Sequence, residues 1–149
     1  MTSPGGVVAL LFTDIVRSTE LLSRLGDDAA DELRRRHFAS LRQAVAASGG
    51  DEVKSLGDGL MVSFTSPVAA LSCAVAMQGS VEGSGLELRV GVHAGEPIRE
   101  ESDLFGGAVV VAKRLCDAAQ GGQILTSQLV ADLVGGRAPS GSGRWGRWR

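Results

Sequence analysis

The 149-residue sequence predicts an α+β domain with a ferredoxin-like βαββαβ core, in which helices cover one face of the sheet. Three observations lead to this fold class. Apolar, strand-like runs occur at 7–13 and 86–93, and an Asp-Gly turn joins two further apolar runs within 49–64. Helical patterns separate these strands, so the chain order is strand, helix, strand, strand, helix and strand.

The first helical region is expected at 18–47, directly after the first strand. Gly26 predicts a break or bend near its start, and Gly49-Gly50 predicts its end, because glycine is favoured just past a helix C-terminus. The second half is amphipathic, with arginines on the polar side. The apolar side is expected to comprise Leu33, His37, Leu41 and Val45.

The hairpin and the next helix have clear end signals. The turn is predicted at Gly57-Asp58-Gly59, between two runs of alternating polarity. Ser66-Pro67 then begins a helix, with serine as the cap and proline in the first turn. This helix is expected to run to about Met77, before a loop and the alternating strand at 86–93.

The C-terminal part continues the pattern less regularly. A loop or short edge strand is expected at 97–103, a helix at 107–119 and a short strand at 123–125. Thr126 is expected to cap a last helix that ends at Val134. We therefore predict one domain at 1–134. The remaining residues, 135–149, are rich in Gly, Ser, Arg and Trp and are expected to form a loose tail.

The composition is typical of a globular protein, and its cysteines are expected to be in the reduced thiol form. Net charge is −2 and mean hydropathy is +0.12, so no basic field favours nucleic acid or an anionic membrane surface. Residues 1–6 lack the features of a signal peptide, and Cys73 and Cys116 fit no disulfide or zinc pattern. We expect a cytoplasmic location, with no nucleic-acid or membrane partner.

Two acidic residues stand at the ends of separate predicted strands. Asp14 ends the first apolar run, and Asp58 lies in the hairpin turn. If the sheet places these strands side by side, their carboxylates suit a pair of divalent cations, which indicates phosphoryl chemistry. Taken singly, Asp14 is more often a turn or cap residue and Asp58 an ordinary turn aspartate.

Four segments in register resemble the class III nucleotidyl cyclase catalytic domain. They are FTDIVRST at 12–19, KSLGD at 54–58, DLFG at 103–106 and, downstream, Arg114. The resemblance covers about 7–127 and implies a cyclase-like fold. It also implies that the last strands of that fold are either missing or replaced by the arginine- and tryptophan-containing tail.

The resemblance implies a role for each matching residue. Asp14 and Asp58 correspond to the metal-binding carboxylates of two Mg²⁺ or Mn²⁺ ions, helped by the backbone carbonyl of Ile15. The turn after Asp14 corresponds to the segment whose amides hold the triphosphate at a helix start. That phosphate-binding segment comprises Ile15, Val16, Arg17, Ser18 and Thr19.

The resemblance also implies how the substrate is selected and converted. Lys54 and Asp103 correspond to the base-selecting pair. A lysine donor and a carboxylate acceptor complement N1 and the amino group of adenine but oppose guanine, so ATP is expected. Arg114 corresponds to the catalytic arginine that stabilises the transition state. The implied activity is an adenylate cyclase that makes 3′,5′-cyclic AMP and pyrophosphate by two-metal-assisted attack of the 3′-hydroxyl on the α-phosphate.

In this family the active sites form between two catalytic domains, so the resemblance implies a homodimer. One copy would supply the metal-binding acids. The other would supply Lys54, Asp103 and Arg114 to the same site.

The sequence departs from the family in two places. The family's transition-state asparagine falls at Val110, and the chain contains no asparagine at all. The family's late lysine is also missing, because the only lysines are Lys54 and Lys113. Loss of one such donor costs on the order of 10²–10³ in rate, so low activity is expected.

Two other interpretations stay open. The chain could be a cyclase-homology domain that binds nucleotide or dimerises for regulation with little turnover, an interpretation that Val110 favours. It could also be a ferredoxin-like nucleic-acid binder, which the acidic pI near 5.7 opposes. Separately, Arg114 could be a solvated residue near a helix end, and His93 is expected to be a packed strand residue.

Overall fold

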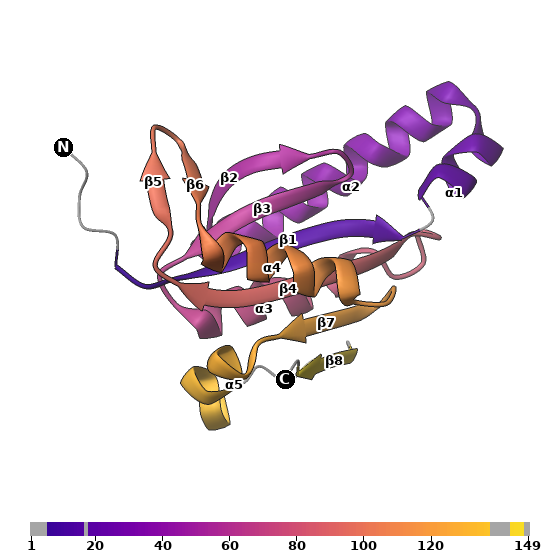
Figure 1. Ribbon diagram of the computed structural model, residues 1–149. Coiled ribbons are helices and arrows are strands. Elements are labelled where there is room, and N and C mark those ends of the chain that lie inside the picture. Colours follow the sequence, from indigo (N-terminus) through magenta and orange to yellow (C-terminus); the bar gives the residue numbers. More distant parts are fainter. Residues whose placement is uncertain (1–5, 17, 138–143, 148–149) are drawn as a thin grey trace.

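The computed structural model describes residues 6–16, 18–137 and 144–147 of the chain. Its main feature is a six-stranded sheet with the strand order β2-β3-β1-β4-β7-β8 (Figure 1). The expected βαββαβ order is present from β1 to β4. The strands of this sheet are β1 (Val8–Val16), β2 (Asp51–Leu56), β3 (Gly59–Phe64), β4 (Glu87–Gly95), β7 (Gln123–Thr126) and β8 (Arg144–Arg147).

Strand β1 lies inside the sheet and is antiparallel to both of its neighbours, β3 and β4. Its residues from 8 to 13 are all buried. Successive side chains of a strand point to opposite faces, so β1 contributes to two separate cores. Ala9 and Leu11 belong to one core, whereas Leu10 and Phe12 belong to the other.

Helices α2 (Asp27–Ala47) and α3 (Pro67–Ser80) cover the face that bears the larger core. Helix α1 (Ser18–Leu25) precedes α2, and the break between them falls at Gly26, where φ is 83°. A positive φ is easily adopted only by glycine, which confirms the expected break. Ser66 Oγ accepts a hydrogen bond from the Ala69 amide at 3.2 Å and so caps α3, as expected.

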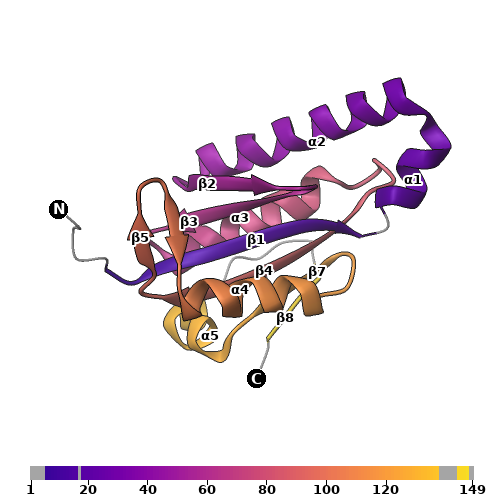
Figure 2. The ribbon, with the colours of Figure 1, turned by 45° about the horizontal axis from the view of Figure 1, so that its top comes forward.

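The opposite face is covered by α4 (Gly107–Ala118), so the expectation of helices on one face only was wrong (Figure 2). Ala112 and Cys116 of α4 pack in the second core with Leu10 of β1. Gly91 of β4 makes this close approach possible, since a Cβ there would overlap the backbone nitrogen of Cys116. Helical periodicity shows which residues of a helix are apolar but not which sheet face receives them.

Helix α5 (Gln128–Val134) starts one residue later than expected. Thr126 is the last residue of β7, and the cap is Ser127, whose Oγ accepts a hydrogen bond from the Val130 amide at 3.3 Å. Ser127 Oγ also lies 2.7 Å from Nδ1 of His93. Burial lowers the pKa of His93, so its neutral form is favoured in this packed position.

A second, two-stranded sheet occupies the segment expected to be a loop or edge strand. It is an antiparallel hairpin of β5 (Ile98–Glu100) and β6 (Asp103–Phe105). In Figure 1 this hairpin stands beside β2, and α4 follows it directly. The hairpin therefore brings Asp103 to the same region of the molecule as the edge strand β2.

The C-terminal part contains a short 3₁₀ helix, η1 (Gly135–Arg137), and then β8, which pairs in parallel with β7. The composition of this segment carries no recognisable strand signal. Within the described residues, no helix is both long and apolar enough to cross a lipid bilayer.

Candidate active site

The sheet brings the regions of Asp14 and Asp58 together. Gly59 follows Asp58 directly, and a Cβ on Gly59 would overlap the carbonyl oxygen of Thr13. The Leu60 amide also donates a hydrogen bond to Thr13 Oγ1 at 3.0 Å. The hairpin turn therefore rests against the end of β1, which places the two aspartates on touching segments of adjacent strands.

Asp14 is held by an arginine that the sequence analysis did not identify. Arg89 is directly opposite Asp14 in the β1–β4 register, and its Nη2 lies 2.8 Å from Asp14 Oδ2. Arg89 Nη1 also donates to the carbonyl oxygen of Asp117 at 3.0 Å. Burial opposes the charge of Arg89, but the hydrogen bond and charge of Asp14 outweigh it and raise the pKa of Arg89. The side chain of Asp14 is therefore fixed against β4.

Asp58 is paired with a second arginine. Nε of Arg34 on α2 lies 3.2 Å from Asp58 Oδ1, and the Arg34 side chain is 44% exposed. Burial lowers the pKa of the neighbouring His37, while the charge of Asp58 partly opposes this shift. Because Arg34 is more exposed than Arg89, which is 25% exposed, we expect it to leave its carboxylate more easily.

Lys54 and Asp103 form a direct pair across 49 residues of sequence. Nζ of Lys54 lies 2.9 Å from Asp103 Oδ2, and Asp103 Oδ1 accepts a hydrogen bond from the Leu104 amide at 2.7 Å. These two hydrogen bonds hold the pKa of Asp103 below its ordinary value, although the carboxylate is solvent-accessible. Nζ of Lys54 also lies 5.7 Å from the centre of the Phe105 ring. A donor and an acceptor are thus held side by side before any ligand binds.

The expected phosphate-binding segment joins β1 to α1. Ile15 is 7% exposed, so only its backbone is available to a ligand. Val16 ends β1 and Ser18 begins α1, with Thr19 next in the helix. Arg17 lies outside the described residues. A strand end that leads almost directly into a helix start is an arrangement that favours anions.

Arg114 and Val110 lie on the exposed side of α4. Val110 is 47% exposed, and its position one turn before Arg114 places both on the same helix face. Arg114 makes no hydrogen bond or ion pair with any residue that the structure describes. Within one chain, the structure does not join Arg114 to Asp14 or Asp58.

The donor set fits a divalent cation with a preference for oxygen. Across the described part of the chain, no cluster of three or more His, Cys, Asp or Glu side chains forms a complete metal cage. Two carboxylates and a backbone carbonyl are instead typical of Mg²⁺ or Mn²⁺, which keep water and substrate phosphates as further ligands. Asp14, Asp58 and the carbonyl of Ile15 are the residues that could hold such ions.

Comparison with known proteins identifies the family to which this fold belongs. The family model described as the adenylate and guanylate cyclase catalytic domain matches residues 2–139. The chain belongs to this family.

Individual relatives agree with this assignment. An adenylate cyclase of Mycosarcoma maydis is 35% identical over 89% of the chain, and an uncharacterized protein of Mycobacterium tuberculosis is 32% identical over 92%. The chain spans only 6% and 48% of these two curated relatives.

Solved structures show the same fold. The adenylyl cyclase CyaB of Pseudomonas aeruginosa matches with a TM-score of 0.77 and 26% identity, over 86% of this chain and 80% of that one. A monomeric adenylate cyclase of Trypanosoma brucei matches with a TM-score of 0.79 and 25% identity, over 92% and 80%. The class III cyclase fold expected from the sequence is confirmed.

Proposed function

We propose that the protein is an adenylate cyclase that converts ATP to 3′,5′-cyclic AMP and pyrophosphate. The observation that carries the choice of ATP is the pair formed by Lys54 and Asp103, 2.9 Å apart. Adenine offers an acceptor at N1 and a donor at its amino group, which match a lysine donor and a carboxylate acceptor. Guanine offers the reverse pattern and would leave both side chains unpaired. The curated relative from Mycosarcoma maydis is itself named an adenylate cyclase.

The reaction forms a bond between the ribose 3′-oxygen and the α-phosphorus and breaks the bond from that phosphorus to the β-phosphate bridging oxygen. Asp14 and Asp58 would hold two divalent cations, which when bound lower the pKa of the 3′-hydroxyl and offset charge on the phosphates. Arg114 would donate hydrogen bonds to the α-phosphate as its charge develops. The 3′-hydroxyl proton passes to solvent, and pyrophosphate leaves.

A homodimer would complete the site. The exposed side of α4 and the β5–β6 hairpin carries large apolar side chains next to Asp103, and such a patch is typical of a protein interface. Arg114 does not reach the acids of its own chain, so a second copy would bring it to them. The exposed apolar side chains of this region are Ile98, Phe105, Val110 and Val111.

A second candidate function is a regulatory cyclase-homology domain with little turnover. Val110 favours it, because a valine on the same helix face as Arg114 offers no hydrogen-bond donor to the ribose. The two candidates share the fold and the nucleotide site, and they differ only in rate.

The test is cyclic AMP production from ATP with Mn²⁺, measured beside GTP for the wild type, Asp14→Asn and Asp58→Asn. We expect product from ATP in preference to GTP, with each variant reduced at least about 100-fold, since each loses a cation ligand. Asp132→Asn, an exposed acid on α5, is the matched control and should keep wild-type activity. Absence of product at protein concentrations that support dimers would refute turnover and leave the regulatory function. Equal rates with ATP and GTP would refute the base assignment.

A further inference from the structure

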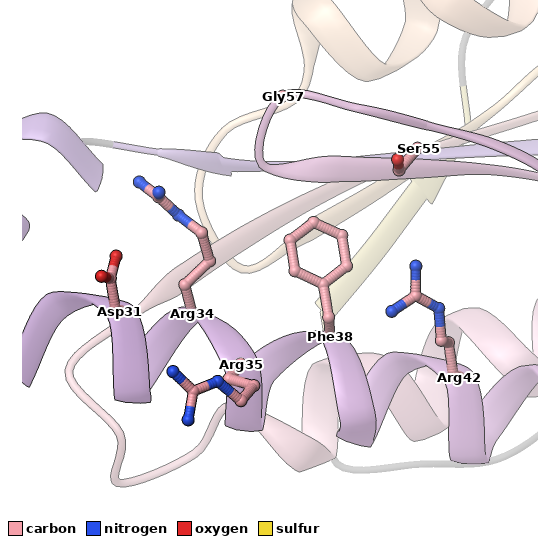
Figure 3. A pocket seen from close by; sticks show the side chains of 7 residues that line it. All are labelled: Asp31, Arg34, Arg35, Phe38, Arg42, Ser55 and Gly57. Atoms are coloured by element: carbon pink, nitrogen blue, oxygen red, sulfur yellow. The ribbon is translucent and has the colours of Figure 1, made fainter.

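A groove of about 440 Å³ lies between α2 and β2 (Figure 3). Arg34, Phe38 and Arg42 of α2 line one side, and Ser55 of β2 lines the other. Ser55 follows Lys54, and neighbouring side chains of a strand point to opposite faces. The groove is therefore on the other face of β2 from the Lys54–Asp103 pair. Its volume is within the range of small-molecule sites.

Arginines dominate the lining of this α2–β2 groove. The lining contains three arginines and one acid, Asp31, and each arginine has a carboxylate partner outside the lining: Arg34 pairs with Asp58, Arg35 with Glu32 and Arg42 with Glu52. Arg34, Phe38 and Arg42 are spaced four residues apart, which places them along one side of the helix. Two guanidinium groups that flank an aromatic ring suit an anion that also carries a flat apolar group.

Arg42 is held ready for a ligand. Its Nε and Nη2 donate to the carboxylate of Glu52 at 2.8 and 3.2 Å, which fixes the plane of the guanidinium. The hydrogen bonds and charge of Glu52 raise the pKa of Arg42. Among the described residues, Nη1 of Arg42 has no hydrogen-bond partner. Because the group is already oriented, little side-chain entropy is lost when an anion binds Nη1.

The Phe38 ring supplies the apolar surface. Figure 3 shows the ring between Arg34 and Arg42, pointing from α2 toward β2. The side chain is half-buried at the edge of the larger core, and the Arg42 guanidinium carbon lies 5.3 Å from the ring centre. A planar ligand ring can stack on the exposed part of Phe38 while its anionic group reaches the arginines.

We propose that the α2–β2 groove is a second binding site, specific for a small aromatic phosphate. The phosphate lies against Nη1 of Arg42, and the aromatic ring lies on Phe38. Arg34, on the other side of Phe38, pairs with Asp58 at 3.2 Å. Nucleoside monophosphates and other aryl phosphates share this chemistry.

The test is isothermal titration calorimetry with phenyl phosphate, AMP and inorganic phosphate in a buffer that contains EDTA. EDTA removes the divalent cations that the proposed cyclase site needs, and a Lys54→Met background removes the proposed base-recognition donor, so binding in the groove is measured apart from that site. We expect phenyl phosphate to bind more tightly than inorganic phosphate. Arg42→Gln should weaken phenyl phosphate about 10-fold, through loss of a charged hydrogen-bond donor.

Two further variants test the role of the aromatic ring and of general surface charge. Phe38→Leu should reduce the affinity for phenyl phosphate to that for inorganic phosphate. The variant removes the surface on which the ligand ring stacks but keeps the arginine that binds the phosphate. Arg36→Gln is the matched control: Arg36 is on the same helix and is 77% exposed, but does not line the groove. It should leave binding unchanged. Circular dichroism establishes that each variant is folded.

The affinity for AMP, compared with that for phenyl phosphate, shows which kind of aromatic phosphate the groove prefers. Tighter binding of AMP than of phenyl phosphate supports a nucleotide, and weaker binding supports another aryl phosphate. The proposal is overturned if the wild type binds neither compound, or if Phe38→Leu has no effect. It is also overturned if Arg36→Gln weakens binding as much as Arg42→Gln, because diffuse surface charge would then explain the affinity.

Discussion

At the scale of single residues, Val110 is the position where a small change should raise activity. It lies on the exposed face of α4, one turn before Arg114. Val110→Asn would add an amide donor on that face, and we expect a rate increase of about 10- to 100-fold, by analogy with the cost of removing one such donor.

A second substitution at the same position provides the control for this experiment. Val110→Leu has a side chain of similar size to asparagine but adds no hydrogen-bond donor. It should leave the rate of cyclic AMP formation unchanged. If Val110→Asn gives no gain over Val110→Leu, the missing asparagine does not limit turnover.

The Lys54–Asp103 pair makes a prediction about pH. Lys54 and the Leu104 amide lower the pKa of Asp103 below the ordinary 3.8, so the stabilisation is complete above pH 3.8 and is lost as the pH falls through the lower, folded value. Lys54→Met should move the pKa of Asp103 upward toward 3.8. A carbon-13 NMR titration of the Asp103 carboxyl measures this shift, and identical titration curves in both proteins would contradict the pairing in solution.

Residue spacing was enough to select Asp14, Asp58, Lys54 and Asp103 as candidates. The structure pairs Lys54 with Asp103 and puts Asp14 and Asp58 on touching segments of adjacent strands. Their arginine partners could not be found in the same way. Arg89 opposes Asp14 only through the register of β4 against β1, and Arg34 reaches Asp58 only through the position of α2 on the sheet. An arginine inside the apolar strand at 86–93 was the one signal available, since such a residue usually has a partner.

At the scale of elements, the contact between α4 and β4 depends on Gly91. A Cβ at this position would overlap backbone atoms of α4, which cannot move aside as a flexible side chain can. We expect Gly91→Ala to lower the free energy of unfolding by about 1–3 kcal/mol, the usual cost of overpacking a core. Urea denaturation measures the change.

Gly107, the first residue of α4, provides the matched control for Gly91→Ala. No atom lies within 4 Å of the Cβ that Gly107→Ala would add, so stability should change by less than about 0.5 kcal/mol. Equal losses in the two variants would show that the packing of α4 on Gly91 is not the cause.

The elements themselves were predictable to different degrees. β1, the β2–β3 hairpin and the α1–α2 break follow from a continuous apolar run, an Asp-Gly turn and Gly26, which are local signals. The sheet face chosen by α4, the Ser127 cap and the strand β8 depend on contacts with distant segments. Thr126 and Ser127 are both favoured cap residues by type, and the length of β7 decides between them.

At the scale of the whole molecule, the proposed dimer can be tested by mixing two inactive proteins. Asp14→Ala would damage the acidic half of each site, and Arg114→Ala the other half. In an equal mixture, random exchange makes half of the dimers heterodimers, each with one intact site, so about a quarter of wild-type activity should return. Cyclic AMP formation against mixing ratio measures this.

A control mixture distinguishes complementation between two copies from an effect of the higher total protein concentration. Asp14→Ala mixed with Asp58→Ala should stay inactive, because both lesions are on the same half of the site and every site carries one of them. Activity in this control, or none in the first mixture, would contradict a site shared between two copies.

The irregular register of β2 has a consequence for how copies of this chain can meet. β2 is at one edge of the sheet, and its pairing with β3 shifts between Glu52 and Lys54, which is a β-bulge. An open edge invites strands of other molecules, but a bulge and charged side chains make it a poor template. The edge is thereby protected from continuous sheet growth and aggregation.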